Sequence, residues 1–109
     1  MNYYDNQNRN AFKSLKENSI ILDFNGCNYP GEIHFILKEK FGFPEYYSEN
    51  WDALFDCLDD RFFETKKYHI NIYGYTTLKA QLRDYCADMI KVFEDINKEH
   101  PNVIFKIVS

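Results

Sequence analysis

Three short apolar runs, separated by segments of helical periodicity, most constrain what this chain can fold into. The runs span residues 19–24, 68–73 and 103–108, and their β-branched and aromatic content is typical of strands. Strands that are joined through helices pair in parallel, with right-handed crossovers. The order strand, helix, helix, strand, helix, strand therefore predicts an α/β fold, in which a three-stranded parallel sheet is packed with helices. We expect about four helices in all.

Local signals predict where individual elements begin and end. Residues 19–24 show no regular alternation of apolar and polar side chains, so we expect this strand to be buried on both faces. Pro30 favours the first turn of a helix over residues 29–41, and Gly42 favours its C-terminal cap. An apolar stripe over residues 77–99 indicates either one helix or two, because periodicity alone does not distinguish them.

The length of 109 residues suits one compact domain. Residues 1–18 are polar and rich in asparagine, so we expect an N-terminal extension there, either partly disordered or packed as an added element. The domain itself is expected to span residues 19–109. No apolar run approaches the roughly 20 residues of a membrane span, and the N-terminus lacks the apolar core of a signal peptide. We therefore expect a cytoplasmic protein that does not bind membranes.

The charge of the chain limits its partners. The formal net charge is −4, whereas proteins that bind nucleic acids are usually basic, so we expect a basic protein partner and no nucleic acid. Cys27, Cys57 and Cys86 are odd in number and far apart, which indicates reduced thiols.

An acidic stretch, residues 44–60, stands out because it holds six Asp or Glu residues and no Lys or Arg. Pro44 keeps the residue before it out of helical geometry. Ser48, or as a weaker alternative Asn50, is expected to cap the following helix. That helix should end near residues 61–63.

The acidic helix is expected to be two-faced. On a wheel of about 100° per residue its apolar face holds Trp51, Leu54, Phe55, Leu58 and Phe62. Its other face holds Asp52, Asp56, Asp59 and Asp60, with Glu49 at the edge. Asp is a poor helix former, and each pair of like charges four residues apart destabilises a helix by about 0.2–0.5 kcal/mol. Solvation is the simpler explanation, but a face without lysine that breaks these rules indicates a surface for a cationic partner.

A catalytic alternative uses the same residues. Asp52, Asp56 and Asp59 would hold Mg²⁺ for phosphoester hydrolysis, since hard cations prefer carboxylate oxygens. Residues 44–60 themselves include no basic residue that would hold the phosphate. The chain also lacks Cys and His at metal-ligand spacing, a Gly-rich phosphate loop and a nucleophile elbow. We therefore expect no enzyme, no catalytic residues, no metal and no cofactor.

A family resemblance is carried by residues 44–58, which read Pro-Glu-Tyr-Tyr-Ser-Glu-Asn-Trp-Asp-Ala-Leu-Phe-Asp-Cys-Leu. This run resembles the signature of the barstar family of bacterial ribonuclease inhibitors, usually Pro-x-Tyr-Tyr-Gly-x-Asn-Leu-Asp-Ala-Leu-Trp-Asp-x-Leu. The resemblance covers residues 19–109 and implies the same parallel fold. It implies a non-catalytic, antitoxin-like cytoplasmic protein that is a monomer when free and plugs the active site of a basic ribonuclease of the barnase type.

The resemblance also implies the main contacts with that partner. Asp56 resembles the central carboxylate, which sits where a substrate phosphate would sit. Asp52 resembles its neighbour, which meets basic residues of the enzyme. Tyr46 and Asn50 resemble loop contacts, and Phe55 stands where the family often has Trp.

Further positions complete the expected surface. Ser48 stands where the family has Gly, between the two loop contacts, and Asp59 replaces a small residue and adds charge at the rim. Asp95 resembles a Glu that meets a peripheral Arg, and Glu99 resembles another acidic contact. By helical spacing, Asp88 shares their face of the last helix. A rival interpretation keeps this acidic face but gives it a basic partner that is not a ribonuclease.

Overall fold

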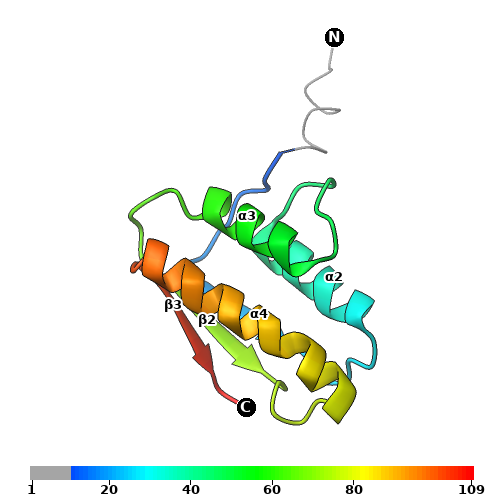
Figure 1. The fold of residues 1–109 in the computed structure, drawn as a ribbon. Coiled ribbons are helices and arrows are strands. Elements are labelled where there is room, and N and C mark those ends of the chain that lie inside the picture. Colours follow the sequence, from blue (N-terminus) through cyan, green and yellow to red (C-terminus); the bar gives the residue numbers. More distant parts are fainter. Residues whose placement is uncertain (1–10) are drawn as a thin grey trace.

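The computed structural model describes residues 11–109, and its elements follow the predicted order (Figure 1). Their bounds are β1 Ser19–Asp23, α2 Pro30–Phe41, α3 Trp51–Arg61, β2 Tyr68–Tyr73, α4 Ala80–Glu99 and β3 Val103–Ile107. The strand order is β1-β2-β3, and both pairings are parallel. The predicted α/β fold with a three-stranded parallel sheet is therefore confirmed.

The helices begin and end close to the predicted positions. Helix α2 starts at Pro30 and is closed by Gly42, whose φ of 65° lies in the left-handed region that glycine adopts without strain. The stripe over residues 77–99 forms one helix, α4, of 20 residues. Residues 11–109 thus hold three α-helices, and the prediction of about four is not confirmed. None of these helices combines the length and hydropathy that a membrane crossing requires.

The sheet is buried on one face only, which corrects the expectation for the first strand. Buried and exposed residues alternate along β1, and the Ile21 side chain is 50% exposed. The strand order advances in one direction, so successive right-handed crossovers carry the helices to the same side of the sheet. Figure 1 shows α2, α3 and α4 layered together against the sheet. The order of the strands decides which face of the sheet the helices cover. That order could not be deduced from the apolar runs in the sequence.

The core lies between this sheet face and the helices. Ile70 of the central strand is fully buried beside Phe105, which stacks on Phe93 of α4 with ring centroids 4.4 Å apart. Leu54 and Leu58, on the underside of α3, anchor the helix to this core, and both are fully buried. Complete burial of a side chain of this size contributes about 1.5–3 kcal/mol. The underside of α3 is thus fixed while its other face points outward.

Residues 11–17 pack against the ends of α2 and α3. The Lys13 amide donates to the Gly42 carbonyl at 2.9 Å, and Arg61 donates to the Lys13 carbonyl. The Phe12 ring lies edge-on to Phe43 at 6.2 Å, with the Arg61 guanidinium 5.0 Å from the Phe12 ring centroid. This part of the expected N-terminal extension is an added packed element, and its first ten residues lie outside the described range.

Candidate functional site

The N-terminus of α3 is capped by Asn50. The Asn50 side-chain oxygen accepts a hydrogen bond from the Ala53 amide at 2.7 Å, so the expectation that favoured Ser48 is wrong and the Asn50 alternative is right. Ser48 is exposed, and its carbonyl accepts from the Asn50 amide at 2.8 Å. No non-glycine residue among residues 11–109 has a positive φ, so Ser48 needs none of the freedom of the family's glycine.

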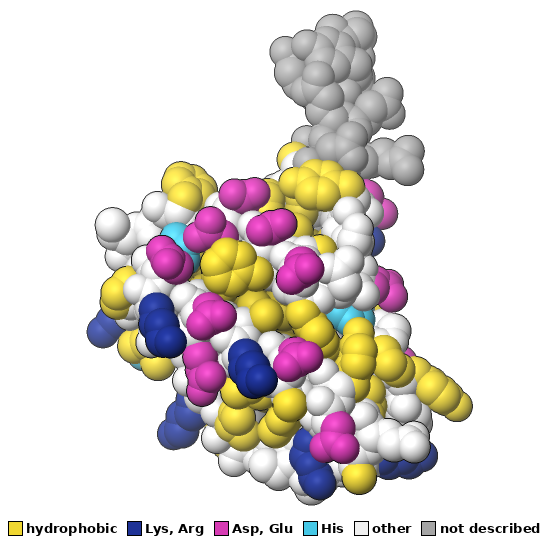
Figure 2. All heavy atoms as spheres, viewed as in Figure 1, with side chains coloured by type: hydrophobic (Ala, Val, Ile, Leu, Met, Phe, Trp, Pro, Cys, Tyr) yellow, Lys and Arg dark blue, Asp and Glu magenta, His cyan; other side chains and the backbone are white. Residues whose placement is uncertain are grey.

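The carboxylates of α3 point into solvent. Asp52, Asp56, Asp59 and Asp60 are all exposed, while Leu54, Cys57 and Leu58 are buried beneath them. Asp52, Asp56 and Asp60 follow one another at intervals of four residues, about 6 Å along the helix axis. Within residues 11–109 none of these three forms an ion pair. Figure 2 shows acidic side chains gathered around apolar ones on the side of α3 and α4.

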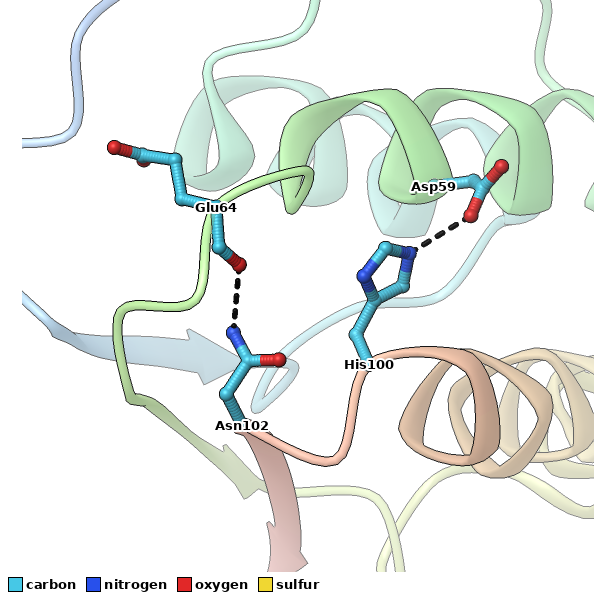
Figure 3. Close-up of polar contacts among 4 residues, drawn as sticks. All are labelled: Asp59, Glu64, His100 and Asn102. Atoms are coloured by element: carbon cyan, nitrogen blue, oxygen red, sulfur yellow. Dashed lines mark hydrogen bonds and ion pairs between the residues drawn. The ribbon is translucent and has the colours of Figure 1, made fainter.

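Asp59 differs from the other three because it has a partner within the protein. Its carboxylate lies 2.8 Å from Nε2 of His100, which follows the C-terminus of α4 (Figure 3). Next to this contact, the Asn102 amide donates to the carbonyls of Glu64 and Lys66, at 3.1 Å and 2.6 Å. These contacts tie the end of α3 and its following loop to the segment between α4 and β3.

A groove of about 460 Å³ runs between α3 and α4. It is lined by Asn50, Trp51, Asp52, Phe55, Asp88, Val92 and Asp95. Half-buried Trp51 and Phe55 with buried Val92 supply apolar lining, and carboxylates from both helices supply acidic groups. The fold thus brings Asp52 and Asp95, which are far apart in the sequence, to the same hollow.

On the α4 side of the groove, lysines neutralise the negative charge of the carboxylates only weakly. Lys91 lies 3.8 Å from Asp88, and Lys98 lies 3.9 Å from Asp95, and all four side chains are more than half exposed. Exposed pairs of this kind contribute about 0–1 kcal/mol, so the carboxylates remain available to a partner. Asp88 was not among the assigned contacts, although its spacing of seven residues from Asp95 already placed it on that face.

The remaining expected contacts lie around this groove. Tyr46 is 57% exposed in the loop before α3. Partial burial, with Cys57 and Asp60 nearby, raises the pKa of the Tyr46 hydroxyl, so it stays protonated and able to donate. Glu99 is exposed at the C-terminal end of α4 and does not line the groove.

The site combines exposed carboxylates with apolar side chains. Among residues 11–109, no three His, Cys, Asp or Glu side chains, Asp52, Asp56 and Asp59 included, are grouped so that they could hold a metal ion. Burial, with Asp60 and Asp56 nearby, raises the pKa of Cys57 to about 11, so this thiol is a neutral part of the core. Exposed carboxylates beside apolar side chains can hold cationic groups of another molecule.

Comparison with known proteins identifies a family and a curated relative. A family model described as "Barstar (barnase inhibitor)" matches residues 18–109, which include every strand and helix described above. The chain is also similar to the Bacillus subtilis (strain 168) protein named "Putative ribonuclease inhibitor YrdF". The two are 29% identical over 89 residues, which cover 82% of this chain and 94% of that relative.

Proposed function

The chain belongs to the barstar family, and we propose on this premise that it inhibits a ribonuclease by occupying its active site. A ribonuclease active site is a concave, cationic pocket that binds phosphates. The observation that carries the proposal is the row of exposed carboxylates on α3, of which Asp52, Asp56 and Asp60 have no ion pair among the described residues. A fixed helix with carboxylates one turn apart presents the kind of charge that such a pocket binds in RNA.

Complementary charge acts at two stages of binding. At a distance, the acidic face of the inhibitor and the basic cleft of the enzyme steer the two molecules into register. On contact, the close fit excludes water, and each charge pair becomes stronger in the lower dielectric. Leu54 and Leu58 hold α3 in place from its underside. The helix therefore does not have to become ordered on binding, which lowers the entropic cost of forming the complex.

The proposed roles divide between the exposed face of α3, which carries Asp56, and the groove, which Asp52, Phe55 and Asp95 line. Asp56 is the central phosphate mimic, and Asp52 beside it meets further basic groups of the enzyme. Asp95 meets a peripheral arginine from the α4 side, and Phe55 supplies apolar contact between these charges.

Other proposed contacts lie at the margins. Tyr46, Ser48 and Asn50 form the loop contact before α3. Asp59 and Glu99 add charge at the rim, although Asp59 shares its carboxylate with His100.

Family membership also suggests where the protein acts and what it binds. We propose a cytoplasmic, antitoxin-like protein that is a monomer when free and that binds a basic ribonuclease of the barnase type without catalysis, metal or cofactor. Residues 19–109 are the inhibitory domain, and residues 1–18 are an extension that precedes it.

The proposal is tested by inhibition of a ribonuclease of this type with Asp56→Asn, which removes one charge and keeps the shape of the side chain. Losing one member of a buried charge pair costs about 2–5 kcal/mol of binding free energy. This range rests in part on measurements of the barstar–barnase pair itself. We therefore expect Asp56→Asn to weaken binding at least about thirtyfold. Glu39→Gln is the matched control, because Glu39 is exposed on α2, outside the groove.

Equal inhibition by Asp56→Asn and the wild-type protein would contradict these roles, as would an equal loss from Glu39→Gln. The rival partner is tested by capturing proteins on the immobilised wild-type chain and assaying them for ribonuclease activity. Capture of a basic protein without that activity, lost with Asp56→Asn, would favour the rival.

A further inference from the structure

His34 of α2 is buried at the junction of three parts of the molecule. Its side chain is 1% exposed, and both ring nitrogens have partners. Nδ1 lies 2.7 Å from the hydroxyl of Tyr47, in the loop before α3, and Nε2 lies 2.7 Å from the hydroxyl of Tyr85, on α4. The imidazole therefore joins the loop to two helices through one side chain.

The hydrogen bonding suits a neutral imidazole. In either neutral tautomer one ring nitrogen donates and the other accepts, and a tyrosine hydroxyl can do both. Burial lowers the pKa of His34, with Glu49 acting in the opposite direction, so the neutral form is favoured at pH 7. Burial also keeps the Tyr47 hydroxyl protonated by raising its pKa.

Trp51 connects this cluster to the groove. The centroid of the His34 ring lies 4.6 Å from that of Trp51, and the Trp51 and Tyr85 centroids lie 4.9 Å apart. Trp51 is the first residue of α3 and also lines the groove beside Asp52. Movement of the His34 cluster, meaning His34, Tyr47, Trp51 and Tyr85, would therefore move the start of α3.

The loop over residues 44–50 is anchored at its start, where Pro44 is buried and Glu45 lies 3.2 Å from Lys38 of α2. Within it, the Tyr47 amide donates to the Pro44 carbonyl at 3.1 Å, and the Asn50 amide donates to the Ser48 carbonyl at 2.8 Å. Tyr47 is 8% exposed, whereas Tyr46 on one side and Ser48 on the other are exposed. Beyond Pro44, the Tyr47 ring is thus the part of this loop that reaches the core, and its hydroxyl lies against Nδ1 of His34.

We propose that His34 is a positioning residue of the inhibitory surface: by joining Tyr47 to Tyr85, it fixes the loop over residues 44–50 and the first turn of α3 in the geometry that the partner binds. The effect on binding rests on the proposed function, whereas the effect on the loop does not. A loop held in place before binding needs no ordering on contact, which slows dissociation.

The test uses variants that remove one hydroxyl and keep the ring. Tyr47→Phe and Tyr85→Phe each break one end of the bridge, and Tyr75→Phe removes a tyrosine hydroxyl outside the cluster as the matched control. Amide hydrogen exchange is measured in the free protein at Tyr47 and Asn50 and, for comparison, at Ile70 of β2. A net hydrogen bond of ordinary strength predicts roughly fivefold faster exchange at the two loop amides and unchanged exchange at Ile70.

Two further variants ask which end of the bridge holds the loop. An asparagine amide reaches the position of Nδ1, and a glutamine amide reaches that of Nε2. We expect His34→Asn, which keeps the Tyr47 contact, to leave the loop amides closer to wild type than His34→Gln. The reverse order would overturn the inference, as would equal acceleration of exchange at the loop and at Ile70.

Binding is measured with the same variants against the inhibited ribonuclease. Dissociation is expected to be about five times faster for Tyr47→Phe and Tyr85→Phe, with association unchanged. A looser loop with unchanged dissociation would overturn the role in binding. If the wild-type chain inhibits no ribonuclease and the loop amides still respond as expected, the proposed function fails and the anchoring of the loop stands.

Discussion

Protonation of His34 would place a positive charge inside an aromatic cluster, so folding stability is expected to depend on pH through this residue. The titratable groups that face it are Tyr47, Tyr85 and Glu49. Burial lowers the pKa of His34 in the folded state, whereas in the unfolded chain it titrates near its ordinary value of 6.5. The stability that neutral His34 contributes is present above pH about 6.5 and is lost as the pH falls below it.

The measurement is urea unfolding of the wild-type protein and of His34→Asn between pH 7.5 and pH 5.5. We expect the wild-type protein to lose more stability over this interval than the variant. His69→Asn is the control, because His69 is exposed on the uncovered face of the sheet and should keep the wild-type dependence. Equal loss in the wild-type protein and His34→Asn would exclude His34 as the source.

Trp51 offers an independent probe of the same residue, because it is the one tryptophan in the chain. Its ring lies against His34, and a protonated imidazole quenches the fluorescence of an adjacent indole. Emission should therefore fall as His34 gains its proton, and it should not fall in His34→Asn.

At the scale of elements, the cap of α3 links stability to binding. Asn50→Ala removes the acceptor of the Ala53 amide and is expected to cost about 1 kcal/mol of unfolding free energy. Asn50→Asp keeps a capping oxygen, and Ser48→Ala leaves the cap untouched, so both should stay within about 0.5 kcal/mol of wild type. Urea unfolding at pH 7 provides the comparison. A loss from Ser48→Ala equal to that from Asn50→Ala would contradict the assignment of the cap.

The elements themselves were predictable because their signals are local. Pro30, Gly42 and the apolar stripe of α3 act within a few residues of where they stand, and the predicted bounds of α2 and the predicted end of α3 agree with the structure. The choice between Ser48 and Asn50 was not local, since both residue types cap helices well. The structure decides it, because the Asn50 side-chain oxygen is the one that reaches the Ala53 amide.

The parts that the sequence left undetermined depend on contacts across the fold. The pairing of Asp59 with His100 joins residues 41 positions apart, and no periodicity indicates it. The same holds for His34, because nothing in the helical pattern of residues 29–41 indicates that it is the buried link between the loop and α4. Helical spacing thus predicts which site residues share a face. Contacts with other parts of the fold decide what each of those residues can do.

At the scale of the whole molecule, we expect the acidic groups of α3 and α4 to attract a basic partner together. The salt dependence of the association rate tests this. Association with a basic ribonuclease is expected to slow by roughly tenfold or more between about 0.01 M and 0.5 M salt, because salt screens steering between exposed charges. Dissociation should change much less. Stopped-flow measurement of the association and dissociation rates over this range of salt concentration provides the test.

Charge variants provide the control for this behaviour. Asp52→Asn and Asp56→Asn together should make the salt dependence of the association rate shallower, whereas Glu39→Gln should leave the slope nearly unchanged. A slope that is insensitive to all of these variants would mean that the acidic face does not guide the encounter.

The packing of residues 11–17 has a practical consequence for how the protein is prepared. The family match starts at residue 18, yet the Gly42 carbonyl takes its hydrogen bond from Lys13, and Phe43 is covered by Phe12. Phe43 lies 5.0 Å from Tyr47, the residue that anchors the loop. A recombinant fragment that starts at residue 18 would expose the ring of Phe43, which contacts Tyr47 in the loop over residues 44–50, so the fragment should begin upstream of residue 11.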